Sequence, residues 1–74
     1  MLESERKKLI ELTSKAVDIN RVLLNEEERF LKATAEEADL SLLRSINDEI
    51  KLLMRKEVLY IGATAFYLQK IVAG

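Results

Sequence analysis

The sequence predicts an all-α protein, a long antiparallel helical hairpin that assembles into a four-helix bundle or with a partner. Three observations predict this fold. Proline is absent and glycine occurs only twice among 74 residues, so the usual signals of turns are missing. Leu, Glu, Lys and Ala, which are strong helix formers, dominate the composition. Apolar residues also recur at steps of three and four, as on one face of a helix.

A first helix is predicted near residues 3–36. Its apolar side chains repeat every seven residues, and a second set lies one residue later and widens the apolar face. A face of this width is typical of a bundle helix rather than of a narrow two-stranded coiled coil. The first set comprises Leu2, Leu9, Ala16, Leu23 and Phe30, with Leu12, Ile19 and Ala33 three positions later, and the second comprises Ile10, Val17, Leu24 and Leu31.

The periodicity breaks in the middle of the chain, where a turn is expected near residues 37–40. Thr34 and Glu37 have the T-x-x-E spacing of a capping box. Asp39 or Ser41 is a further candidate for the cap of a second helix.

Acidic residues directly after Asn25 indicate a competing helix start, because the helix dipole favours negative charge in a first turn. This alternative divides the chain into three helices. We favour two helices, because two segments of matched length close a hairpin without an overhang.

A second helix is predicted near residues 40–73, and it has two apolar lines. One neighbouring helix cannot cover both, because they lie on nearly opposite sides. The line that continues the first helix's pattern comprises Leu43, Ile46, Ile50, Leu53 or Met54, Val58, Ile61, Ala65, Leu68 and Val72, and the second line comprises Leu52, Leu59, Phe66 and Ala73.

An isolated hairpin of this kind leaves one apolar line in water, which favours self-association or capture by another protein. Gly62 and its small neighbours indicate a close approach by another helix, since glycine inside a helix costs about 1 kcal/mol relative to alanine. A membrane span is disfavoured, because the uncharged run over 58–69 is shorter than the roughly 20 residues that a bilayer requires. The expected partner interface comprises Leu52, Leu59, Gly62, Ala63, Phe66 and Tyr67.

Asn20 and Glu57 are polar residues inside the apolar stripes. If the turn is centred near Ala38, Glu57 lies level with Ile19 and Asn20. A polar layer of this kind fixes the register and oligomeric state of a bundle, and the alternative is that Glu57 reaches solvent or Arg21 at the rim. A catalytic carboxylate is disfavoured because no base, nucleophile or Gly-rich loop accompanies Glu57.

The absence of Cys and His removes thiolate and imidazole chemistry and the usual zinc and haem ligands. We therefore expect no enzyme activity, no catalytic residues, no cofactor and no metal. The start of the chain is charged rather than apolar, so we expect a cytoplasmic protein without a secretory signal. The net charge of −1 argues against nucleic-acid binding as the main function.

These features predict a non-enzymatic protein–protein interaction module, a small helical adaptor or accessory subunit. It would homodimerise or dock on a larger partner through its apolar C-terminal helix. The length and this helix resemble the small helix-hairpin co-chaperones of bacterial secretion systems, which implies a chaperone-like role as one alternative. A second alternative is a dimeric regulator that contacts nucleic acid through Arg6, Lys7 and Lys8 together with Arg55 and Lys56.

Overall fold

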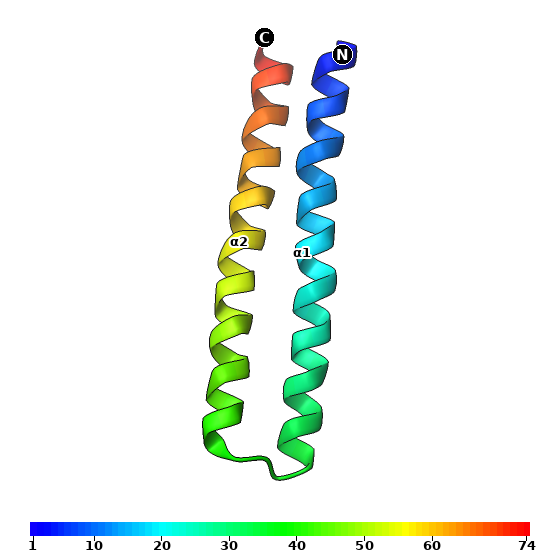
Figure 1. The fold of residues 1–74 in the computed structure, drawn as a ribbon. Coiled ribbons are helices and arrows are strands. Elements are labelled where there is room, and N and C mark those ends of the chain that lie inside the picture. The colour runs from blue at the N-terminus through cyan, green and yellow to red at the C-terminus, as the bar shows by residue number, and fades with distance from the viewer.

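The computed structural model describes residues 1–74 as two long helices joined by a short turn. Helix α1 is Glu3–Ala35 and helix α2 is Leu40–Ala73. They run side by side in opposite directions, so that both termini lie at the end of the rod farthest from the turn (Figure 1). The Cα atoms extend over 54 × 15 × 12 Å. The predicted all-α hairpin of two helices is confirmed.

Helix α1 begins where the carboxylate of Glu5 accepts a 2.8 Å hydrogen bond from the backbone N–H of Leu2. The helix passes through Asn25 without a break, so the three-helix alternative is wrong. The predicted capping box is wrong too, because Thr34 lies inside α1 and its hydroxyl donates to the carbonyl of Phe30 at 2.8 Å. A threonine that bonds back to the preceding turn of its own helix cannot cap the next helix.

The end of α1 is a Schellman motif with Glu37 in the left-handed position, at φ 56°. The N–H of Ala38 donates to the carbonyl of Ala33 at 2.9 Å, and the N–H of Glu37 donates to that of Thr34 at 3.1 Å. These two bonds satisfy carbonyls that the helix end would otherwise leave without partners. Helix α1 therefore stops at Ala35, one residue before the predicted end.

Helix α2 begins after Asp39, whose carboxylate accepts a 3.3 Å hydrogen bond from the backbone N–H of Ser41. Of the two candidate caps, Asp39 is therefore the one used, as its residue type favours at an N-cap.

The helices meet along a seam of positions that alternate in steps of three and four, as in an antiparallel coiled coil. Its best buried members are Leu23, Ala33 and Ile46. The remaining seam residues are only half-buried, because a single neighbouring helix covers one side of each. On α1 the seam comprises Leu9, Leu12, Ala16, Ile19, Leu23, Glu26, Phe30 and Ala33, and on α2 it comprises Leu43, Ile46, Ile50, Leu53, Glu57, Tyr60, Thr64, Tyr67 and Ile71.

The second half of α2 differs from the expected apolar line. The expected apolar line moves from Leu53 to Met54, a shift of one residue, and continues from there. The observed seam instead keeps its alternating steps of three and four and continues from Leu53 to Glu57 and Tyr60. A one-residue shift turns a helix by about 100°, so a shifted line would leave the face that α1 contacts. The shifted residues Met54, Val58, Ile61, Ala65, Leu68 and Val72 are consequently exposed.

Candidate interaction surface

Most of the exposed apolar residues of the hairpin lie on two surfaces, one on each side of the seam. We call the first the flank face. On each helix, the positions concerned come one and four residues after every second seam residue. The flank face consists of the apolar residues at these positions. The flank face comprises Ile10, Val17, Leu24 and Leu31 of α1 with Met54, Val58, Ile61, Ala65, Leu68 and Val72 of α2.

The helical geometry places these two sets on the same side of the hairpin. Viewed along a right-handed helix from its N-terminus, the flank positions lie clockwise of the seam. The second helix runs in the opposite direction and faces the first, and these two reversals bring both flanks to one side. The hydrogen bond from Nδ2 of Asn20 to Oε2 of Glu57, at 2.8 Å, joins the helices along this side.

This hydrogen bond also fixes how the helices align. Because both helices rise equally per residue, residues of α1 and α2 lie level when their numbers add up to about 76. Lys15 and Tyr60 fit the same rule, since the Lys15 ammonium lies 5.6 Å from the centre of the Tyr60 ring. The predicted placement of Glu57 level with Asn20 is thus confirmed by a direct contact.

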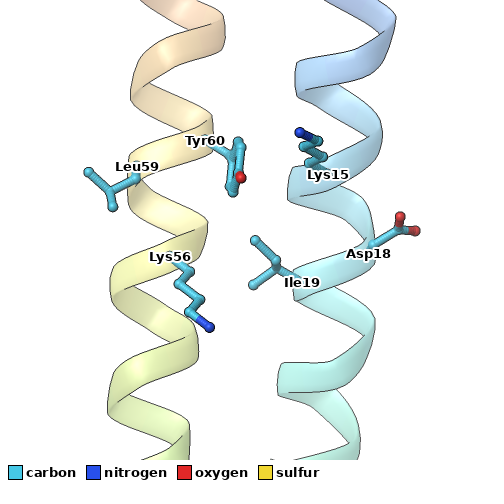
Figure 2. Close-up of a pocket in the computed structure, with 6 residues that line it drawn as sticks. All are labelled: Lys15, Asp18, Ile19, Lys56, Leu59 and Tyr60. Carbon is cyan, nitrogen blue, oxygen red and sulfur yellow. The ribbon is translucent and has the colours of Figure 1, made fainter.

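The opposite side of the hairpin has an open groove of about 490 Å³. Figure 2 shows Lys15 and Tyr60 pointing toward one another across it, whereas Asp18 points outward. Lys15 is engaged with the ring of Tyr60 and also lies 3.7 Å from a carboxylate oxygen of Glu11. The groove lacks the convergent unpaired polar groups that orient a small-molecule ligand. Its lining is Lys15, Asp18, Ile19, Lys56, Leu59 and Tyr60.

The second apolar surface is the outer stripe, made of Leu52, Leu59 and Phe66 on α2. Leu59 is 70% exposed and Phe66 is 71% exposed. Leu59 points away from α1 in Figure 2, at the edge of the groove. These residues lie on the groove side of α2. Leu59 also lines a shallow depression with Met54 and Val58 of the flank face, so the two surfaces adjoin on the outer side of α2.

The other residues of the expected interface lie in different environments. Tyr67 is half-buried in the seam, where it faces α1. Ala63 is exposed beside the outer stripe. A Cβ atom added at Gly62 would meet no atom within 4 Å, so the close approach expected at this glycine is not made by α1.

The charged residues form short surface pairs within α1. Arg6 Nη2 lies 2.7 Å from Oε1 of Glu3, and this hydrogen bond raises the pKa of the exposed Arg6 guanidinium above its ordinary value. Exposed pairs of this type contribute little to stability. No group of three or more acidic side chains is arranged to hold a metal ion.

The two basic clusters lie apart along the rod. With the alignment set by Asn20 and Glu57, Arg55 is level with Arg21, so the clusters are separated by about 20 Å. Arg6 is in addition paired with Glu3. The single hairpin therefore offers no continuous basic surface.

No part of either helix combines the length and the apolar character that crossing a bilayer requires.

The sequence revealed the outer stripe directly, through its seven-residue repeat. The exposure of the flank face was missed, although the signal was present. Continuing the alternating steps of three and four from Leu43 and Ile46 leads to Glu57 and Tyr60. Because Glu57 is polar, the apolar line through the neighbouring Val58 looked like the better continuation of the seam.

No protein-family model, curated protein or solved structure matches this chain.

Proposed function

We propose that the chain is a non-enzymatic protein–protein interaction module, a small helical adaptor or accessory subunit that associates through the exposed apolar residues of α2. One observation supports this most strongly. In its second half α2 turns Glu57, Tyr60, Thr64 and Tyr67 toward α1. The more apolar residues of the same segment point away from α1, among them Val58, Leu59, Ile61, Phe66 and Leu68.

This arrangement is costly for a chain that remains alone. Burying a Val, Leu, Ile or Phe side chain contributes about 1.5–3 kcal/mol. Five such side chains, each 46–71% exposed, leave several kcal/mol unused. That amount is comparable with the roughly 5–15 kcal/mol by which a whole small domain is stable. Covering these residues with protein recovers the free energy, which is why we assign them to an interface.

The test compares two double variants. Ile61→Glu with Phe66→Glu introduces charge into both exposed apolar surfaces of α2. Ser14→Glu with Asn25→Glu, the matched control, adds the same charge at exposed positions on the polar side of α1. Both variants keep good helix formers, so circular dichroism should show intact helices in each.

We expect the wild-type chain and the control to associate, with themselves in sedimentation velocity or with a specific protein co-purified from the cells that make the chain. The α2 variant should lose that association. The proposed function would be refuted if the wild-type chain is a monomer and if every protein that co-purifies with it also co-purifies with the α2 variant.

A further inference from the structure

We infer that the flank face is the contact surface for a second copy of this chain, with the two hairpins related by a twofold axis parallel to the rod. This inference rests on the proposed function and specifies its partner. The product is a four-helix bundle in which α1 of each copy lies against α2 of the other, antiparallel to it.

The first argument is the match of apolar residues level by level. In this arrangement α1 of one copy meets α2 of the other with the same alignment as within the hairpin. Ile10 and Val17 of α1 then each fall between two flank residues of the opposing α2, as knobs fall into holes, and Leu24 falls between Met54 and Lys51. Leu31, the flank residue nearest the turn, is level with Ser45 and lies outside this apolar match. From the open end toward the turn the order is Leu68, Ile10, Ala65, Ile61, Val17, Val58, Met54, Leu24 and Lys51, with Ile10, Val17 and Leu24 from α1 of one copy.

The second argument is charge complementarity. On the flank side, between Leu24 and Leu31, Glu27 on α1 and Lys51 on α2 are exposed and make no ion pair within the chain. With the twofold axis along the rod, Glu27 of each copy lies within one helical turn of the level of Lys51 of the other. The two symmetry-related pairs bring opposite charges together at the rim of the interface.

The alternative twofold axis, across the rod, gives a poorer match. It inverts one hairpin, so that each helix packs against its own copy. Leu68 and Val72 then lie opposite Asn47 and Arg44 of the second copy, and Ile10 lies near Glu27 of the second copy. With this axis at the middle of the rod, apolar residues would thus be buried against polar and charged ones, which is unfavourable.

The third argument is the area available. The chain exposes 5884 Å². A compact monomer of its mass, 8.5 kDa, is expected to expose about 4,700 Å². The excess is larger than the roughly 800 Å² that each partner contributes to a standard stable interface. A second hairpin is long enough to cover this excess, because its flank face has the same length and the same sequence.

The first experiment compares Ile61→Glu with its control Leu59→Glu by sedimentation equilibrium from low micromolar to submillimolar concentrations. Ile61 is 53% exposed on the flank face, and Leu59 is 70% exposed on the outer stripe. The inference predicts that the wild-type chain dimerises, that Ile61→Glu weakens the dimer by at least about a hundredfold and that Leu59→Glu changes it by less than about threefold. Equal loss in both variants, or a wild-type monomer throughout the range, would overturn it.

The second experiment uses charge reversal, and it does not depend on a core substitution being tolerated. Glu27→Lys alone brings two ammonium groups together at both symmetric sites of the dimer, and Lys51→Glu alone brings two carboxylates together there. Each variant should dimerise about tenfold more weakly than the wild-type chain. An equimolar mixture should recover the wild-type affinity, because the heterodimer has an attractive pair at both sites in place of the two repulsive ones.

Recovery in the mixture cannot come from contacts within one chain, since neither chain contains both substitutions. A mixture no stronger than its components would therefore overturn the twofold axis along the rod. The outcomes also separate the two proposals. A monomeric chain that binds a different protein through Phe66 overturns the second copy as the partner and leaves the interaction module standing.

Discussion

The contact between Asn20 and Glu57 provides the most informative test of the seam. Glu57 is half-buried at a seam position, and its carboxylate accepts the 2.8 Å hydrogen bond of Asn20. We predict that replacing both residues with leucine stabilises the hairpin. The same change should remove the constraint that fixes the level of one helix against the other, because polar layers specify register at a cost in stability.

The expected magnitude follows from the burial of the two residues. Asn20 is exposed, so its hydrogen bond contributes at the lower end of the usual range, about 0.5–1 kcal/mol. Half-burying a leucine at position 57 contributes about 1 kcal/mol and removes the desolvation of a carboxylate. The double variant should therefore gain about 1 kcal/mol, which raises the Tm of a chain of this size by roughly 4–8 °C.

The assay is a double-mutant cycle of urea unfolding, followed by circular dichroism at one fixed protein concentration, since association makes stability depend on concentration. Asn20→Leu alone should be slightly destabilising, Glu57→Leu alone stabilising, and their coupling about 0.5–1 kcal/mol. Sedimentation of the double variant should show a mixture of assemblies. A coupling near zero, or an assembly identical to that of the wild-type chain, would refute the register role.

Two further predictions concern backbone positions. Glu37→Gly should stabilise the chain by about 0.5–1 kcal/mol, because a φ of 56° strains any residue with a Cβ, and a rise of a few degrees in Tm would show it. Gly62→Ala should stabilise by a similar amount, about 0.5–1 kcal/mol in urea unfolding, since the added methyl enters open space. A loss of stability in Glu37→Gly would contradict the Schellman geometry. A weaker assembly of Gly62→Ala would show that a partner's backbone reaches Gly62.

The hairpin itself was predictable because its determinants are local. The apolar periodicity of α1 runs from Leu9 to Ala33 with Glu26 as its one polar member, and the caps that the hairpin uses lie near the middle of the chain. Two helices of nearly equal length with a central turn have a single simple alignment, which places Asn20 beside Glu57 from the residue numbers alone. The hydrogen bond between them confirms that alignment.

The rotation of α2 about its own axis was not predictable to the same degree. Hydrophobicity favoured Val58 and Ile61 as the residues facing α1, and seam geometry favoured Glu57 and Tyr60. Both lines have helical spacing, so composition alone does not decide between them. The contact with α1 over the well-packed half, where Ile46 is only 1% exposed, fixes the rotation, and the rest of the helix follows.

This rotation has a consequence for the proposed interaction module. It places the flank face on one side of the seam and turns the outer stripe toward the other side, so Ile61 and Phe66 face different directions although the two surfaces adjoin at Val58 and Leu59. In the proposed dimer the outer stripes of the two copies remain exposed, on opposite sides of the bundle. The dimer would thus present two identical apolar stripes, each beside a groove with Lys15 and Lys56. The proposed adaptor role would require this arrangement, in which the surface that joins two copies leaves the outer stripe free for another protein.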